Sequence, residues 1–289
     1  MEFLKEIVNT WQFNVVLFLL FSILFNQFYK LSVKSVKNDG IATIILQLTA
    51  ALTILIFVPF YPLTFSSDIN IYLLLLAAIV FYTFNDRIQT SVRKNLEVSV
   101  YTVLYQLSKV FLVVYGIIIF KELIIISKLL GGGLILLGNL LLFYEKKRFK
   151  FNKYAFLSAL ASLLVATALI IDVGISKQFN LPFYIMITLI VPAMMLFTFE
   201  KFPIQEMARE FCCERQKYYI ITGFAWGLVV LFTIRSLQLG EVIFIAPLLA
   251  TSVLLNVIVA SVLHKERDHL GKKILAAVLV IIGVYFTVF

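Results

Sequence analysis

The chain has 289 residues, of which 62% are hydrophobic and only 14% are charged. A soluble domain carries about 25% charged and about 45–50% apolar residues, so a water-soluble fold of this length cannot bury so much apolar surface. The formal net charge of +9 comes from short basic clusters between apolar runs, which is typical of membrane loops and excludes a nucleic-acid-binding stripe. We therefore expect an integral, multi-pass membrane protein of a bacterial-type inner membrane.

Ten segments are long and apolar enough to cross a bilayer as helices, which takes about 20 residues each. In chain order they are 12–32, 41–60, 70–91, 97–120, 127–144, 154–176, 181–200, 217–235, 241–263 and 270–288. No small-residue cleavage site follows the first segment, so we expect it to remain as an uncleaved span. In the connector after the seventh segment, Ile204, Met207, Ala208 and Phe211 recur at helical spacing, which predicts a helix along the membrane surface.

The two halves of the chain resemble each other. Residues 97–122 read EVSVYTVLYQLSKVFLVVYGIIIFKE and residues 241–266 read EVIFIAPLLATSVLLNVIVASVLHKE, so Glu-Val opens both segments and Lys-Glu closes both. The offset between them, 241 minus 97, is 144 residues or half the chain, and a glycine follows in the next span of each half, at Gly138 and Gly283. Five spans is an odd number, so the halves 1–144 and 145–289 are expected to insert with opposite orientation. The sequence thus predicts an all-α membrane domain built from two inverted five-helix repeats.

The loop charges predict an orientation. If both termini lie outside, the cytoplasmic loops hold 19 basic residues and the opposite face holds five, namely Lys5, Lys121, Lys128, Lys177 and Arg235. The positive-inside rule therefore places both termini outside. Lys109 belongs to neither face.

This organisation resembles the drug/metabolite transporter superfamily, and most closely its EamA-like branch. In that family an acidic residue in a Gly-Glu pair closes the fourth span of each half; here the pairs are Lys121-Glu122 and Lys265-Glu266. The resemblance covers the whole chain. It implies a central cavity lined by the first, third and fourth spans of each half, and secondary transport or export of a small metabolite by alternating access. It implies no enzymatic activity and no cofactor.

The chain departs from the family pattern in two ways. Relatives often carry a proline about 13 residues before the closing glutamate, whereas Lys109 and Val253 stand there in this chain, so the residue that would break each helix is missing. Pro247 lies earlier in the ninth span and is expected to kink it. Many relatives also place both termini in the cytoplasm, opposite to the orientation that the charges predict.

Polar residues inside the spans are candidates for lining the cavity, because an ionisable group at mid-bilayer costs about 2.5–3.5 kcal/mol on insertion scales. Spans two and seven offer only Gln47 and scattered Thr. The candidates are Asp86, Tyr101, Tyr105, Gln106, Lys109, Asp172, Trp226, Arg235 and Asn256.

Several candidates also have a structural interpretation. Asp86 and Arg87 can form a local solvated pair at the inner interface, and Arg235 can extend its charge to the headgroups. Aromatic residues more often pack against helices than hold ligands. Glu122 and Glu266 stand at connectors, where a carboxylate favours the N-terminus of the helix that follows.

Lys109 is the sharpest candidate. It lies about twelve residues from either end of its span, or roughly 18 Å at 1.5 Å per residue, too far for its side chain to reach an interface. It must therefore face protein or water. Three roles fit this position: binding an anionic group of the substrate, forming a structural bridge with Asp86 or Asp172, or exchanging a coupling proton as a neutral lysine.

Other sequence features point away from cofactor chemistry. Residues 131–133 form a Gly triplet without the following Gly-Lys-Ser/Thr of a phosphate loop, and are expected to allow close helix approach. His264 and His269 lack the HExxH pattern, so no metal site is expected. Cys212 and Cys213 are expected to be free thiols. No nucleotide-binding motif occurs, so any transport would be driven by a gradient.

Two other classes of function remain open: a membrane-embedded lipid-modifying enzyme and a non-transporting membrane scaffold. An enzyme needs a clustered His/Asp or Ser/His constellation at one interface, which the sequence does not show. A scaffold would tolerate loss of the intramembrane charges, whereas a carrier would not. The expected partners of the protein are a small-molecule substrate and the lipid bilayer.

Overall fold

The computed structural model describes residues 9–34, 36–96, 101, 104–143, 153–212, 214–263 and 270–288. Glu97 and Glu266, which open and close the repeated segments, lie outside the described residues, as do His264, His269 and Cys213.

All regular secondary structure in the described residues is helical. The helices are α2 (Trp11–Val33), α3 (Asp39–Leu55), η1 (Val58–Phe60), α4 (Ile69–Asn95), α6 (Leu107–Ile119), α7 (Ile126–Phe143), α8 (Lys153–Ile175), η2 (Ser176–Gln178), α9 (Leu181–Glu200), α10 (Ile204–Phe211), α11 (Gln216–Leu239), α12 (Val242–Ala250), α13 (Ser252–Leu263) and α14 (Leu270–Val288).

The described chain contains six helices that are long and apolar enough to cross a membrane: α2, α3 with η1, α4, α8 with η2, α9 and α11. Shorter apolar helices cover 107–119, 126–141, 242–256 and 274–288. Each of the ten predicted segments therefore contains an apolar helix. The all-α class is confirmed, and six helices of spanning length indicate an integral membrane protein.

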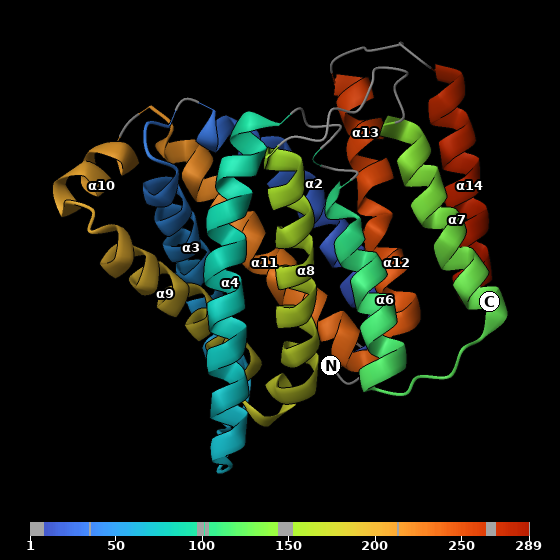
Figure 1. Cartoon of the computed structure of the whole chain (residues 1–289), viewed down its shortest axis with the longest axis horizontal. Coiled ribbons are helices and arrows are strands. Elements are labelled where there is room, and N and C mark those ends of the chain that lie inside the picture. The colour runs from blue at the N-terminus through green and yellow to red at the C-terminus, as the bar shows by residue number, and fades with distance from the viewer. Residues whose placement is uncertain are drawn as a thin grey trace.

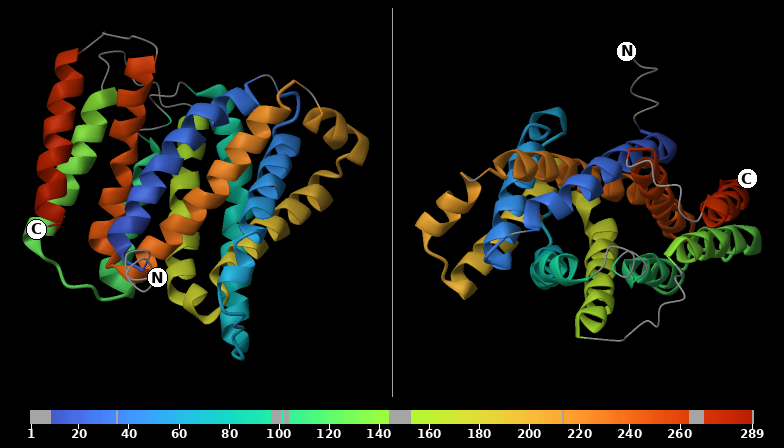
Figure 2. Two further views of the ribbon diagram at one scale, coloured as in Figure 1. Left: turned by 180° about the vertical axis from the view of Figure 1, so that it is seen from behind. Right: turned by 90° about the horizontal axis from the view of Figure 1, so that it is seen from above.

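The helices pack side by side in an up-and-down bundle, with the start of α2 and the end of α14 on the same side (Figure 1). Helix α11 packs along α2 and α3, α4 packs along α8 and α9, and α6 packs against α8 and α12. Helices α7 and α14 form a pair at one edge, which is clearest from above (Figure 2). The main apolar core joins buried residues of α2, α3, α4, α8, α9, α11 and α12.

Both repeated segments contain an interrupted helix. A turn at Gln106 precedes α6, and Thr251 separates α12 from α13. The Lys109 N–H donates to the Gln106 carbonyl at 2.9 Å and the Thr251 N–H donates to the Leu248 carbonyl at 3.1 Å, so both turns close over three residues. The interruptions therefore form without the family's proline. Helix α6 and the α12–α13 pair run in opposite directions through the bundle (Figure 1).

Helices α7 and α14 approach closely because glycines face each other. A Cβ atom added at Gly131 would lie 2.6 Å from the Gly283 carbonyl oxygen, and one added at Gly283 would lie 2.6 Å from the Gly131 carbonyl oxygen. At Gly132 an added Cβ would lie 2.8 Å from Cγ of Pro247. The expectation that the Gly triplet serves close helix approach is confirmed at Gly131 and Gly132.

Replacing Gly131 with Ala is expected to destabilise the protein by about 1–3 kcal/mol, because the new methyl group meets the rigid backbone of α14. Gly133 is the matched control, since nothing lies within 4 Å of a Cβ added there. Gly133→Ala is expected to be neutral, or to stabilise the helix by up to about 1 kcal/mol. Equilibrium unfolding of the purified variants in mixed micelles checks both values. Equal stabilities for the two variants would contradict the packing argument.

The connector after α9 contains the predicted amphipathic helix. Helix α10 has no buried residue, and Ile204 at its start is 71% exposed. Met207 and Phe211 pack against the apolar cluster around Tyr29 and Tyr219. One face of this short helix is thus attached to the bundle, and the expectation of a helix at this place is confirmed.

Candidate functional site

Asp172 is fully buried, and two tyrosines bind its carboxylate. The Tyr82 hydroxyl of α4 donates to Oδ2 at 2.5 Å, and the Tyr184 hydroxyl of α9 donates to Oδ1 at 2.6 Å. The Asp172 side chain in α8 has 0% exposure. Hydrogen bonds to a carboxylate are stronger than those between neutral groups, so this triad joins three helices firmly. Span seven had been expected to offer only Thr residues, which is wrong because it supplies Tyr184.

Asp86 in α4 is also buried, and neutral amides bind it. Gln47 of α3 donates to Oδ2 at 2.8 Å and Asn85 donates to Oδ1 at 2.8 Å. The alternative interpretation, a local pair of Asp86 with Arg87, is not realised, because Arg87 forms an ion pair with Glu200 of α9 at 2.5 Å. Adjacent residues on a helix point about 100° apart, which directs the two side chains to different neighbours.

A hydrogen-bonded chain leads from Asp86 to Tyr101. Gln89 donates to the Asn85 side-chain oxygen at 3.3 Å and accepts from the Tyr101 hydroxyl at 3.2 Å. The Tyr101 ring stacks on Tyr105, with ring centroids 5.6 Å apart and an interplanar angle of 23°. The structure thus brings three predicted candidates together: Asp86, Tyr101 and Tyr105.

Arg93, in the last turn of α4, completes this cluster. Its guanidinium carbon lies 4.4 Å from the Tyr101 ring centroid, 4.3 Å from Tyr29 and 5.3 Å from Phe25. We call Phe25, Tyr29, Arg93 and Tyr101 the aromatic cage. Trp226 of α11 touches it through Phe25, at 6.1 Å between ring centroids.

Arg93 was not among the sequence-predicted candidates. It was counted as a loop cation because the third span was expected to end at residue 91, whereas α4 continues to Asn95. The spacing 86, 89, 93 places Asp86, Gln89 and Arg93 on one helix face, and this pattern could have identified the residue.

Lys109 is buried within the bundle, with 8% exposure. None of the carboxylates in the described residues lies within 4.0 Å of its ammonium, so the structural bridge to Asp86 or Asp172 is not formed. The adjacent polar candidate, Gln106, has a buried side-chain oxygen without a hydrogen-bond partner. Lys109 lies in the first turn of α6, just after the turn at Gln106.

Two predicted candidates lie apart from this cluster. Arg235 near the end of α11 donates to Asn9 at 2.7 Å and to Gln238 at 3.2 Å. Asn256 in α13 donates to the Ser252 carbonyl at 2.8 Å, and its side-chain oxygen is buried without a partner.

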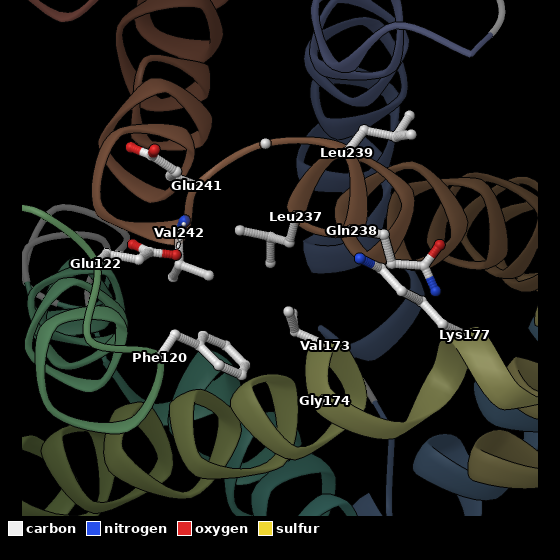
Figure 3. Close-up of a pocket in the computed structure, with 11 residues that line it drawn as sticks. Phe120, Glu122, Val173, Gly174, Lys177, Leu237, Gln238, Leu239, Glu241 and Val242 are labelled. Atoms are coloured by element: carbon white, nitrogen blue, oxygen red, sulfur yellow. Dashed lines mark hydrogen bonds between the residues drawn. The ribbon is translucent and has the colours of Figure 1, made fainter.

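A pocket of about 460 Å³ lies at the other end of the bundle, among the ends of α6, α8 and α11 and the start of α12 (Figure 3). Glu122 borders it and accepts hydrogen bonds from the backbone N–H groups of Val242 and Ile243, both at 2.7 Å. Glu122 therefore caps α12 of the other half. The expectation that it would cap the next helix, α7, is wrong. Lys177 extends into the pocket, and none of the predicted candidates borders it.

Comparison with known proteins shows the fold alone. No family model matches the chain, and no curated protein matches it. One solved structure, described only as "Crystal structure of protein", aligns with 95% of this chain and 95% of its own length. The TM-score is 0.74 and the sequence identity is 11%. An architecture of this kind therefore exists in a solved protein, and the function has to be argued from the site.

Proposed function

We propose that this protein is a secondary transporter of the EamA-like kind, which carries a small metabolite across the inner membrane by alternating access. The observation that carries the proposal is Lys109: a cation buried in the first turn of α6 with no carboxylate within 4.0 Å among the described residues. An ionisable group at this depth is costly, and such groups generally mark a solute or ion pathway. A scaffold would have no reason to keep it.

The helix pairings support the inverted repeat. In an inverted repeat, each helix of the first half has a counterpart in the second: α2 corresponds to α8, α3 to α9, α4 to α11, α6 to α12–α13 and α7 to α14. Replacing each helix of the packed pair α2–α11 by its counterpart gives the pair α8–α4. The same replacement turns α3–α11 into α9–α4 and α2–α13 into α8–α6, and all these pairs occur. The α3–α9, α6–α12 and α7–α14 pairs map onto themselves. Inverted repeats of this kind are found in many secondary transporters.

The two ends of the bundle differ, as expected for a carrier in one of its two states. The pocket lies at the end of the bundle where α6, α8 and α11 finish. The aromatic cage surrounds Arg93 in the last turn of α4, and Figure 1 shows that α4 finishes at the other end of the bundle. In the proposed cycle the helices of the two halves rock about Lys109, so that the path opens alternately at either end.

The proposal includes an orientation that labelling can test. In a chain whose Cys212 and Cys213 are replaced by Ser, we expect Leu63→Cys to react with an impermeant maleimide from outside the cell. Lys37→Cys is expected to react only after permeabilisation, because the positive-inside rule places it in the cytoplasm. Both side chains are exposed, so access to the protein surface does not limit labelling. The reverse pattern would invert the orientation and would leave the fold unchanged.

Solute uptake into proteoliposomes tests the transport function. We expect purified protein to accelerate the uptake of at least one labelled solute from a panel of organic acids, phosphate esters, amines and sugars, compared with protein-free vesicles. Flux that saturates with concentration supports a carrier. Covalent change of a lipid with no solute flux would instead favour the lipid-modifying enzyme, and neither activity would favour the scaffold.

A further inference from the structure

The charged side chains inside the bundle are partnered unequally. Both buried carboxylates are satisfied by neutral donors within the protein: Asp86 by Gln47 and Asn85, and Asp172 by Tyr82 and Tyr184. The two cations Lys109 and Arg93, in contrast, have no carboxylate within 4.0 Å among the described residues. The charged groups that lack an oppositely charged partner are therefore cations. Lys109 is buried, and Arg93 is half-buried with its Nε atom enclosed. Buried polar groups are normally satisfied, so these unpartnered groups point to a ligand that the protein alone does not supply.

Arg93 is held in a way that suits a ligand. Two tyrosine rings lie against its guanidinium at 4.3 and 4.4 Å, which orients the group without neutralising its charge. Arg93 donates a long hydrogen bond to the Asn26 side-chain oxygen at 3.4 Å, and its buried Nε–H has no acceptor. A planar guanidinium with free N–H groups matches the two oxygens of a carboxylate or phosphate.

Aromatic side chains lead from Arg93 toward the segment that carries Lys109. Arg93 contacts Tyr101, and Tyr101 stacks on Tyr105. The turn at Gln106 comes next in the chain, and Lys109 lies in the first turn of α6, which starts just after it.

We propose that Arg93 and Lys109 form a two-station binding path for an oxyanion, a carboxylate or phosphate group, with Arg93 as the station near the cytoplasmic end. The proposal rests on the transport function and names the class of its substrate. The proposed path would select against other solutes. A cationic solute would be repelled by Arg93 and Lys109, and a neutral sugar would leave both charges unpaired.

Binding to wild-type protein in nanodiscs tests the proposal independently of transport. The probes are inorganic phosphate, citrate and benzoate as oxyanions, with choline as the cation and glucose as the neutral solute. We expect at least one oxyanion to bind saturably, and choline and glucose not to bind. Discs of phosphatidylcholine alone and discs containing phosphatidylglycerol separate a soluble oxyanion from a lipid headgroup. Stabilisation by phosphatidylglycerol that depends on Arg93 would identify the headgroup as the source.

Two variants assign the binding to Arg93. Arg93→Met removes the charge and is expected to weaken oxyanion binding about tenfold or more. Asn26→Asp is nearly isosteric and places a carboxylate beside the Arg93 guanidinium. This carboxylate is expected to compete with the ligand and to weaken oxyanion binding to a similar degree. The variant keeps Arg93, so it tests the site even if Arg93→Met folds poorly. Lys94→Gln is the matched control, because the neighbouring cation is exposed and pairs with Asp39 at 2.8 Å; it is expected to bind within about twofold of wild type.

The outcomes separate this inference from the transport function. Binding of no oxyanion in either lipid, preferential binding of choline or glucose, or unchanged binding by both Arg93→Met and Asn26→Asp would overturn the oxyanion path. Transport of a cation or a sugar in proteoliposomes would preserve the carrier and overturn the substrate class. Oxyanion binding that depends on Arg93 without any solute flux would preserve the site and overturn the carrier.

Discussion

Lys109→Met is expected to reduce solute flux strongly while leaving the protein as stable as wild type or more stable. The substitution keeps the length of the side chain and removes the charge. Loss of a charge-assisted contact with the substrate should reduce flux about tenfold to a hundredfold. Folding should not suffer, because an unpaired buried ammonium is costly and an apolar side chain at the same place is not. Flux in proteoliposomes and the unfolding midpoint in mixed micelles are measured on the same preparation.

The combination of lost flux and retained stability distinguishes the role of Lys109. Lys30→Met is the control, since it removes an exposed cation from α2 and is expected to change neither quantity. Charge reversal provides a second check: Lys109→Glu should not be rescued by Asp86→Lys or Asp172→Lys, because no bridge between these residues exists to restore. Wild-type flux in a well-folded Lys109→Met protein would refute the functional assignment.

Removing both tyrosine hydroxyls from Asp172 is expected to cause the largest loss of stability. The double substitution Tyr82→Phe and Tyr184→Phe leaves a fully buried carboxylate without the two donors that bind it at 2.5 and 2.6 Å. Each hydrogen bond to a charged group contributes about 1.5–3 kcal/mol, so the double variant should lose about 3 kcal/mol or more. The free energy of unfolding in mixed micelles checks this value.

A rescue experiment identifies the cause of that loss. Adding Asp172→Leu to the double variant should recover much of the stability, because the stranded carboxylate is replaced by an apolar side chain. Tyr218→Phe is the control for the loss of a hydroxyl, since the Tyr218 ring makes its contacts with Phe28 and Lys217 through its face. A double variant as stable as this control would show that the triad does not join α4, α8 and α9.

The sequence predicted the helices well because lipid imposes a simple rule: a spanning segment must be long, apolar and helical. The ends of the helices were predicted less accurately where polar residues continue a helix. Helix α4 extends four residues past its expected end and carries Arg93 into the cluster, whereas α3 ends at Leu55 and the short helix η1 around Pro59 follows it. The interruption at Gln106 had no proline to indicate it. Pro247, which was expected to kink the ninth span, lies inside α12, shortly before the interruption at Thr251.

The partners of the polar residues were harder to predict, because they come from helices distant in sequence. Asp172 was identified as a candidate, but its two donors lie on α4 and α9, and the sequence does not encode which helices meet. Glu122 was expected to cap the next helix and instead caps α12, 120 residues further along the chain. Glu122 reaches α12 because α6 packs against α12. This contact is a feature of the tertiary arrangement and does not follow from local helix propensity.

Counterflow in proteoliposomes tests the central claim, that the buried Lys109 lies on a path through which a carrier moves solute. Vesicles are loaded with an unlabelled oxyanion that binds the protein, then diluted into a trace of the same labelled compound. A carrier exchanges the two, so wild-type vesicles should accumulate label transiently above its equilibrium level, with no need to know the coupling ion. Vesicles with Lys109→Met should show only passive equilibration. Absence of the overshoot in wild-type vesicles, or an equal overshoot in both, would contradict the account.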